Sequence, residues 1–376
     1  MTFVGDLVPQ KTRPTLPDFR EGWVVANLEG PVCADETPKA LKVGVHLHSA
    51  PFEIKGKWAF ALANNHLMDF GVDGLKQTFA FLSVRKQTAE TAWAGAGTNV
   101  QEAREPMILD EAGKRIAVLS CCERQFGIAT ETTAGVAEKG EWLYAAIAKA
   151  KSAADFVVVS CHCASEFSTA VSQRLQAFYH SLVDAGADVI HGHHSHVPQG
   201  WEEYKGHPIF YGMGNFVVDP DMWRSDPNYQ WSLVARVNFA GEKLTWSVTP
   251  QGCVPADVEG YLARANLGFC RPELLEALWQ ESSVKLYHRL YEQNLRIASV
   301  ESVRLSVRDR LRKILFASGD IIRALFGREL PTTKSKFYGR VAYNFFNCES
   351  HVDMISTALG VLTGSIVDQR EKCANA

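Results

Sequence analysis

Short runs of apolar residues recur along the first 250 residues, separated by polar segments or by segments with helical spacing. The runs are rich in β-branched residues and end in Gly, Asn, Asp or His, a pattern typical of buried strands. Six runs predict strands, at 2–6, 23–31, 58–66, 115–122, 155–163 and 207–216. We expect a further extended segment at 41–51. Residues 232–239 and 244–251, joined across AGEK, predict an antiparallel hairpin.

Helical periodicity fills the spaces between several of these runs, most clearly at 71–82 and 173–186. Strands that alternate with helices predict a layered α/β domain. The chain has 376 residues, of which 46% are hydrophobic, enough for a sizeable core and an appended unit. Strand signals end near Pro255, and helical periodicity follows. We therefore expect an α/β domain over 1–254 and a helical extension over 255–376.

The predicted extension contains a basic segment. Residues 301–340 hold ten Lys and Arg against four Asp and Glu, a local balance of +6. A solvated helix face packed on its own domain is the favoured interpretation. The alternative is contact with an anionic membrane surface or a polyanionic polymer.

Net charge and cysteine usage limit the classes of protein. A net charge of -3 gives no overall field that would attract nucleic acid, so we expect no nucleic-acid partner. The chain starts without a basic and apolar leader, and no apolar run is long enough to cross a bilayer. Its nine cysteines are odd in number, scattered and never in a CxxC pair. This pattern predicts reduced thiols and a cytoplasmic location.

A dense group of histidines marks the candidate site. Four of the 12 histidines lie within residues 191–196, directly after the apolar run 187–190. His194 and His196 are two residues apart, so a turning loop can aim both rings at neighbouring metal positions. Clusters of this density mostly bind metal, although surface or core histidines are the alternative.

Polar side chains also follow the other predicted strands, and sites in α/β proteins form at the carboxyl ends of strands. Carboxylate, amide oxygen and imidazole ligands together suit Zn, Mn or Fe better than Mg or Ca. A shared carboxylate would let such a set hold two divalent ions. The strand-end residues are Asp6, Asn27, Glu29, Asn64, Asn65, His66 with Asp69, and His162 with Glu166.

Several of these positions have a structural alternative. Asn64 and Asp69 could cap the helix that follows them. Asn215 could be a turn residue or a hydrogen-bond partner of a metal-binding histidine. Cys161 and Cys163 flank His162, and strand alternation predicts that they face away from it, into the core.

A second set of residues lies where a substrate anion could be met. Lys42, His46 and His48 belong to the predicted extended segment at 41–51. An exposed strand edge would carry the same residues, so both interpretations stay open.

The motifs and their order resemble the calcineurin-like metallophosphoesterases, and more closely the related bacterial capsule-synthesis or poly-γ-glutamate-synthesis proteins. The resemblance spans about 2–250, and its specific part is 184–218. It implies a four-layer α/β/β/α sandwich with the metals at the strand ends. The motifs are GD (5–6), NLEGP (27–31), NNHLMDFG (64–71), HCASE (162–166), DAGADVIHGHHSHVPQ (184–199) and YGMGNFVV (211–218).

The resemblance also implies a role for each candidate. Asp6 and His196 would bind the first metal. Asn65, His162 and His194 would bind the second. Glu29 would be the carboxylate that bridges them. His66 would contact the substrate phosphate and protonate the leaving group. The remaining candidates are assigned as catalytic (Asp69, Glu166) or substrate-binding (Lys42, His46, His48, Asn64, Asn215).

Three positions depart from the family pattern. Val8 stands where phosphoesterases have a histidine, and Glu29 replaces the usual bridging Asp. The first metal site would therefore be short of a ligand, weakly occupied or completed by another residue. HCASE replaces the usual HWGxE; Glu166 keeps its place, but the aromatic residue is absent.

These features predict a cytoplasmic, metal-dependent phosphoesterase in the synthesis of a capsule or other cell-surface polymer. Its substrate would be a phosphorylated small molecule or polymer, and residues 301–340 would allow peripheral contact with the inner membrane or with capsule-synthesis machinery. The alternative is a non-hydrolytic component of a poly-γ-glutamate or capsule synthesis complex. Val8 favours this alternative, whereas the intact histidines at 162, 194 and 196 favour the enzyme.

Overall fold

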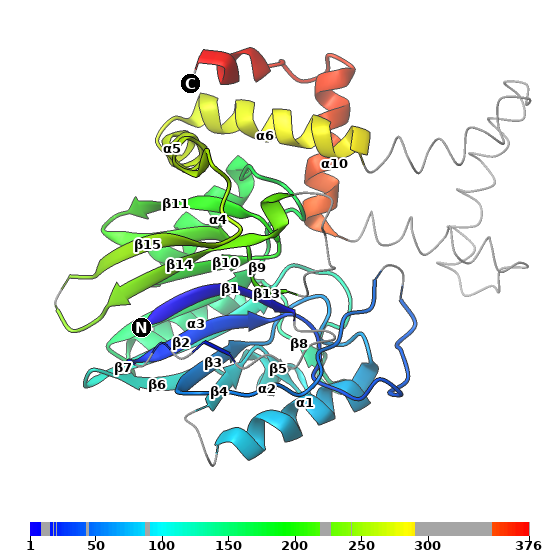
Figure 1. Cartoon of the computed structure of the whole chain (residues 1–376), viewed down its shortest axis with the longest axis vertical. Coiled ribbons are helices and arrows are strands. Elements are labelled where there is room, and N and C mark those ends of the chain that lie inside the picture. The colour runs from blue at the N-terminus through cyan, green and yellow to red at the C-terminus, as the bar shows by residue number, and fades with distance from the viewer. Residues whose placement is uncertain are drawn as a thin grey trace, which may run out of the picture.

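Two β-sheets form the centre of the molecule, with helices on their outer faces (Figure 1). The computed structural model describes residues 1–8, 16–17, 19, 21–42, 45–86, 91–218, 227–241, 243–289 and 348–375. A small third sheet pairs β5 (Ala96–Gly97) with β8 (Gly135–Val136).

The first sheet has seven strands in the order β15-β14-β1-β2-β3-β4, with β13 pairing β1. Strands β1 to β4 are parallel, and the hairpin β14–β15 extends the sheet in antiparallel fashion. Its strands are β1 (Thr2–Val8), β2 (Trp23–Leu28), β3 (Lys57–Ala61), β4 (Thr91–Ala94), β13 (Asn215–Val218), β14 (Trp231–Asn238) and β15 (Thr245–Gly252).

The second sheet has six strands in the order β11-β12-β10-β9-β7-β6. Its four central strands are parallel, and β6 and β11 close the two edges in antiparallel fashion. Its strands are β6 (Met107–Glu111), β7 (Lys114–Cys122), β9 (Phe156–His162), β10 (Val189–His193), β11 (Pro198–Tyr204) and β12 (His207–Met213).

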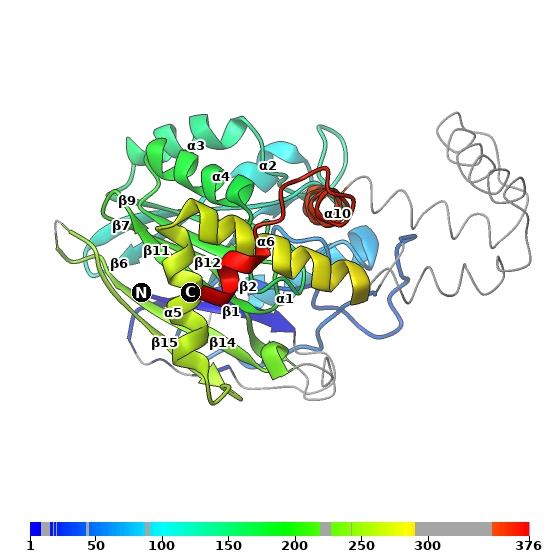
Figure 2. The same ribbon diagram turned by 90° about the horizontal axis from the view of Figure 1, so that it is seen from above.

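Alternating side chains of both sheets build three apolar layers. Phe3 and Val25 face inward and meet Val118 and Val158 between the sheets. On the outer face of the first sheet, Trp58 and its neighbours pack against α1 (Gly71–Lys86). The outer face of the second sheet is covered by α3 (Trp142–Lys151) and α4 (Gln173–Asp184), which lie side by side (Figure 2). The short α2 (Val100–Arg104) packs beside β5. The four-layer α/β/β/α expectation is thus confirmed.

Most of the predicted strands and both predicted helices form, but the extended segment at 41–51 does not become a strand. Its described residues make only an isolated bridge between Ser49 and Val32. Three strands that the pattern did not single out, β4, β6 and β11, lie at or next to sheet edges. They are short or half-exposed, so their apolar signal is weak.

The C-terminal helices pack on the sandwich at the end opposite α1 (Figure 1). They are α5 (Val258–Phe269), α6 (Pro272–Tyr287), α10 (Glu349–Leu362) and a short 3-10 helix (Arg370–Asn375). Phe269 and Leu275 join the apolar cluster formed by α3, α4 and the second sheet. The domain boundary at residue 254 remains a prediction, and the basic segment 301–340 lies outside the described residues.

Two further sequence expectations concern membranes and thiols. Among the described helices, none combines the length and apolarity needed to cross a membrane. All nine cysteines are free thiols, as expected. Cys161 and Cys163 lie in the apolar cluster under α3 and α4, so they do face away from the site side of β9.

Close backbone contacts fix the loops at the strand ends. A Cβ atom on Gly192, in β10 between His191 and His193, would lie 1.8 Å from the carbonyl oxygen of Tyr211 on β12. A Cβ atom on Gly5, just before Asp6, would lie 2.0 Å from the carbonyl oxygen of Gly214. Only glycine allows the neighbouring strands to approach this closely.

Gly192→Ala should therefore destabilise the fold. We expect the free energy of unfolding to fall by about 1–3 kcal/mol, the usual cost of overpacking. The matched control is Gly140→Ala, where the nearest atom to the added Cβ is at 3.5 Å and the change should stay within about 0.5 kcal/mol. Denaturant unfolding measures both, and equal stability of the two variants would contradict the close approach at Gly192.

Candidate metal centre

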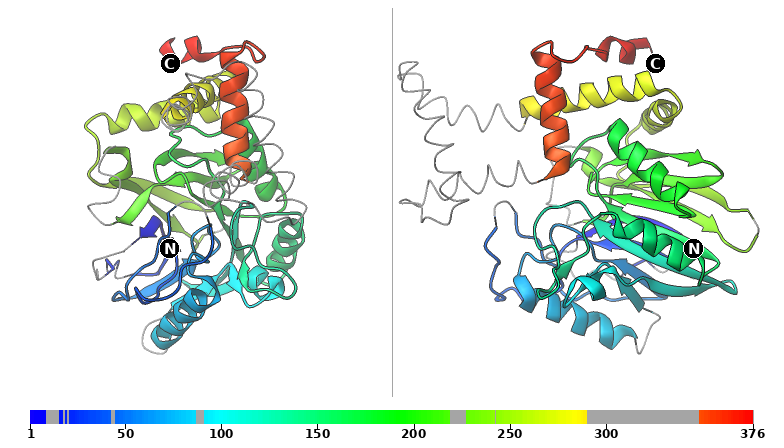
Figure 3. Two further views of the ribbon diagram at one scale, coloured as in Figure 1. Left: turned by 90° about the vertical axis from the view of Figure 1, so that its right-hand side faces the viewer. Right: turned by 180° about the vertical axis from the view of Figure 1, so that it is seen from behind.

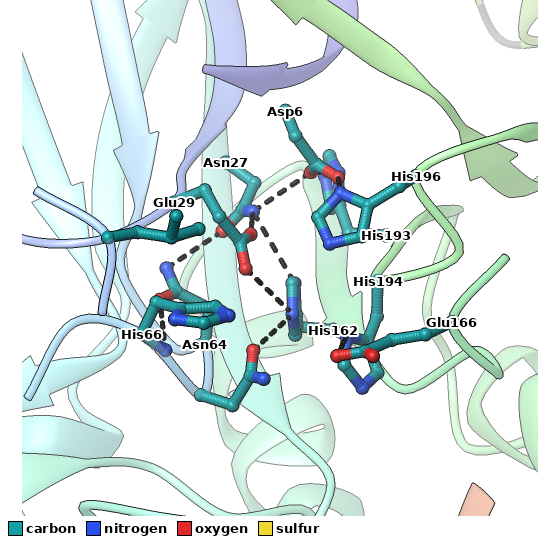
Figure 4. A network of polar contacts seen from close by, with 12 residues as sticks. Asp6, Asn27, Glu29, Asn64, His66, His162, Glu166, His193, His194 and His196 are labelled. Atoms are coloured by element: carbon teal, nitrogen blue, oxygen red, sulfur yellow. Dashed lines mark hydrogen bonds and ion pairs between the residues drawn. The ribbon is translucent and has the colours of Figure 1, made fainter. Parts of the chain in front are cut away.

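The carboxyl ends of parallel strands from both sheets meet at one buried place. Asp6 comes from β1, Asn27 from β2, His162 from the end of β9 and His193 from the end of β10. Figure 4 shows their side chains converging, with Glu29 and His66 on one side and Glu166 and His194 on the other. The structure therefore brings the strand-end residues together at one place, as the sequence predicts; their function as a site stays a prediction.

Asp6 is held by an amide and two imidazoles. Asn27 Nδ2 donates to its Oδ1 at 2.9 Å, and His193 Nδ1 lies 2.8 Å from the same oxygen. His196 Nδ1 lies 3.2 Å from its Oδ2. Burial alone would raise the pKa of Asp6, but hydrogen bonds and charge from the two histidines outweigh it and hold the pKa well below its usual value. Asp6 is therefore a carboxylate.

Glu29 lies beside Asp6 in a less favourable setting. Asn27 Nδ2 also donates to Glu29 Oε2, at 2.5 Å, so one amide joins both carboxyl groups. Glu29 is completely buried, and burial together with the charge of Asp6 raises its pKa to about 8. A divalent cation would supply the positive charge that the protein atoms lack here.

His162 has the properties of a metal ligand. Its Nε2 lies 3.0 Å from Asn65 Oδ1 and 3.5 Å from Glu29 Oε1. Burial, together with the neighbouring His194, holds its pKa well below the usual value. The ring is thus neutral, which is the form that binds metal.

The backbone directly after β10, at residues 194–196, is strained. His194 and His196 have φ angles of 86° and 56°, in the left-handed region that residues with a Cβ seldom adopt. Phe167, directly after Glu166, has a φ of 64°. Strain at non-glycine residues persists only where the surroundings enforce it, and such residues cluster at functional sites.

The potential ligands fall into two neighbouring groups. In each group the three ligand atoms lie within 4.8 Å of one another. Glu29 Oε1 and His194 Nδ1 are among the buried atoms that make no hydrogen bond within the described part of the chain, as expected of atoms that face an ion. Carboxylate and imidazole atoms arranged in this way could hold a metal ion. The groups are Asp6, Glu29 and His162, and Glu166, His194 and His196.

This grouping differs from the one that the family resemblance implied. His162 falls in the group of Asp6, and His196 falls in the group of His194. The two groups are not separate, because the ring centroids of His162 and His194 lie 4.3 Å apart and His196 also contacts Asp6. The division of ligands between two metals therefore stays a prediction. Asn65 Oδ1 lies 3.0 Å from His162 Nε2, and its role as a metal ligand stays a prediction. Glu166, expected to be catalytic, is a potential ligand.

His66 and Asp69 form a pair at the edge of the centre. His66 Nδ1 lies 2.7 Å from Asp69 Oδ2, and Lys42 Nζ lies 3.1 Å from the same nitrogen. Lys42 also pairs with Asp69 Oδ1, and the backbone N–H of Leu47 donates to Asp69 Oδ2. The Asp69 carboxylate therefore contacts His66, Lys42 and the backbone of Leu47. Because these partners do not belong to the helix that follows, Asp69 does not cap that helix.

Asn64 and Asn215 support neighbouring groups. Asn64 Oδ1 accepts hydrogen bonds from the backbone N–H groups of His66 and Leu67, so it stabilises the turn after β3. Its Nδ2 donates to Asn27 Oδ1. Asn215 Oδ1 lies 3.1 Å from His196 Nδ1, as expected for a partner of a metal-binding histidine.

His46 and His48 are not brought to the centre. His46 Nε2 lies 2.9 Å from the carbonyl oxygen of Ala40, and His48 Nε2 lies 2.8 Å from Asp35. Both rings also contact Phe70. These side chains point to local partners, and the idea that they bind substrate stays a prediction.

Three residues of the centre were given no role by the sequence, although it places Asn27 at a strand end and His193 in the histidine cluster at 191–196. Asn27 joins the two carboxylates, and His193 holds Asp6. Glu123 directly follows β7, and its Oε1 lies 3.2 Å from His194 Nε2. Burial would raise the pKa of Glu123, but hydrogen bonds from His194, Cys348 and Ser350 lower it to about 2. Its position after a strand was the available signal.

Comparison with known proteins places the chain in a family. Residues 10–220, more than half of the chain, match the family model described as bacterial capsule synthesis protein PGA_cap. The chain belongs to this family.

Two relatives of this chain are named as CapA biosynthesis proteins. The chain is 33% identical over 217 residues to the capsule biosynthesis protein CapA of Bacillus anthracis, covering 54% of this chain and 52% of that protein. It is 32% identical over 253 residues to the PGA biosynthesis protein CapA of Bacillus subtilis, covering 65% and 66%. The chain thus spans about half to two thirds of the length of these relatives.

A solved structure of a hypothetical protein from Thermus thermophilus aligns with 66% of this chain and 97% of its own length. The TM-score is 0.39 and the sequence identity is 14%.

Replacing His194 and His196 together with Ala should remove most bound transition metal, because the second ligand group loses two of its three members. The matched control is the pair His46→Ala and His48→Ala, which alters two histidines outside the centre. Elemental analysis of the purified proteins gives metal per chain. Full occupancy in the first double variant would place the metal elsewhere.

Proposed function

We propose that this chain is a metal-dependent phosphoesterase that acts in the synthesis of a capsule or another cell-surface polymer. The observation that carries the proposal is the pair of carboxylate–imidazole groups beside His66 and Asp69. The family membership and the printed names of the relatives support the biological setting.

Two neighbouring groups of residues would hold the metal: Asp6, Glu29 and His162, and Glu166, His194 and His196. Divalent ions bound there would polarise the phosphoryl oxygens of a substrate and lower the pKa of the attacking water. Asn27 keeps Asp6 and Glu29 in place, and Asn65 orients His162.

His66 is the proposed proton donor. Its Nδ1 faces Asp69 and Lys42, so its Nε2 is the nitrogen that remains for a substrate oxygen. Burial and the charge of Lys42 lower the pKa of His66. An anionic phosphoryl group would raise that pKa again, so substrate binding would favour the imidazolium that protonates the leaving oxygen.

We assign Lys42 to the positioning of His66 and not to direct binding of a substrate anion. Its ammonium group is buried, and it pairs with Asp69. Removing one partner would leave the other charged and buried, so the two stabilise each other in place. Lys42 and Asp69 together would fix the His66 ring.

A non-hydrolytic role in a polymer-synthesis complex is the second candidate. One observation favours it: Val8, which stands where phosphoesterases have a histidine, is completely buried and offers no ligand atom. His193 takes other partners, since its Nδ1 faces Asp6 and its Nε2 faces His191.

Changing His66 to Asn should keep the metal and lower turnover by about a hundredfold to ten-thousandfold, the usual loss when a general acid is removed. His48→Asn is the matched control, since His48 pairs only locally and should retain turnover. Hydrolysis of p-nitrophenyl phosphate and its diester by the Mn- or Zn-loaded protein measures turnover.

The outcomes separate the candidates. Normal turnover in His66→Asn would contradict the proposed proton donor. Loss of metal from the variant would show that His66 is a ligand. A metal-loaded wild-type protein that hydrolyses no phosphate ester in a broad screen would favour the non-hydrolytic role.

A further inference from the structure

The C-terminal helix α10 begins beside the metal centre. Cys348 Sγ donates to Glu123 Oε1 at 3.0 Å, and Ser350 Oγ donates to the same oxygen at 2.7 Å. These residues follow Glu123 by 225 and 227 positions. Figures 1 and 3 show the first turn of α10 pointing at the sandwich while its far end crosses α6.

Glu123 connects this helix to a potential metal ligand. Its backbone N–H donates to the carbonyl oxygen of His162, so its position is tied to the ends of β7 and β9. Its side chain is almost completely buried, and its Oε1 lies 3.2 Å from His194 Nε2. The carboxylate therefore lies between α10 and His194.

The two nitrogens of His194 face different partners. Nε2 faces Glu123, whereas Nδ1 faces the side of Glu166, at 3.9 Å from its Oε1. A carboxylate that accepts a hydrogen bond from Nε2 fixes the tautomer in which Nδ1 has a free lone pair. This is how outer partners commonly orient metal-binding histidines.

Gln125 is the competing partner in this network. Its Nε2 lies 2.6 Å from Glu123 Oε1 and 2.7 Å from His194 Nε2. If the amide donated to Nε2, the tautomer of His194 would be reversed. An ionised carboxylate is the stronger acceptor, and we take the tautomer in which His194 Nε2–H donates to Glu123. In that tautomer the Gln125 amide donates to Glu123 and not to His194.

We propose that Glu123 is a positioning residue that holds His194 in its ligating orientation, and that Cys348 and Ser350 hold Glu123. The metal centre would then be complete only when the start of α10 is docked. The inference rests on the metal binding of the proposed function and goes beyond it. The family model matches 10–220, so α10 lies outside the matched part of the chain.

Other contacts keep α10 in this place. Glu349 pairs with Lys139 at 2.6 Å and with Arg174 at 3.3 Å, and Ser165 Oγ donates to the carbonyl oxygen of Ser350. Farther along the helix, Trp279 Nε1 donates to Thr357 Oγ1. The ion pairs are partly exposed and contribute little, whereas the contacts to Glu123 are buried.

Metal titration of the full-length protein tests the inference, with Mn²⁺ and Co²⁺ as probes. Glu123→Gln should bind metal about 10–100-fold more weakly, the usual effect of losing an outer partner of a ligand. The Co²⁺ absorption spectrum should also change, because His194 would reorient. Ser350→Ala should weaken binding by about two- to tenfold, corresponding to one hydrogen bond.

Glu349→Gln is the matched control, since it removes two ion pairs of the same helix without touching Glu123. It should bind metal like the wild type. Ser350→Thr keeps the hydroxyl and should restore most of the affinity lost in Ser350→Ala. If Glu123→Gln fails to fold, the comparison of Ser350→Ala with Ser350→Thr still tests the inference.

Unchanged affinity and an unchanged Co²⁺ spectrum in Glu123→Gln would overturn the inference while leaving the proposed function intact. Equal weakening in Glu349→Gln and Ser350→Ala would also overturn it, because general loosening of α10 would explain both. A wild-type protein that binds neither ion would overturn the proposed function itself.

Discussion

Two carboxyl groups buried side by side set the main physical constraint on this protein. Asp6 and Glu29 share the amide of Asn27, and both are almost or completely inaccessible. Burying like charges is costly unless positive charge compensates them. His193 and His196 compensate Asp6, whereas the raised pKa of Glu29 marks a deficit. Bound cations would remove that deficit, so the metal hypothesis follows from the electrostatics as well as from the family.

The rest of the structure serves to hold this cluster. The parallel strands of both sheets end at the same place, which gathers ligands that are up to 190 positions apart in the sequence. Gly5 and Gly192 allow the strands to come close enough for this. The strained backbone at His194 and His196 is tolerated because the surrounding side chains are packed and hydrogen-bonded.

The sequence was informative where a signal is local. Apolar runs located the central strands, and the polar residues after them located the centre, because parallel strands present their carboxyl ends at one edge. Residues whose role depends on long-range packing were not predictable. Nothing near Glu123 in the sequence indicates that Ser350 will contact it. The described residues of the expected extended segment at 41–51 make only an isolated bridge at Ser49, and His46 and His48 face local partners.

Anomalous diffraction from crystals grown with Mn²⁺ tests the central claim most directly. Two peaks about 3.5–4 Å apart are expected, one among Asp6, Glu29 and His162 and one among Glu166, His194 and His196. No peak at either group under saturating Mn²⁺, or ions bound only elsewhere on the protein, would contradict the account.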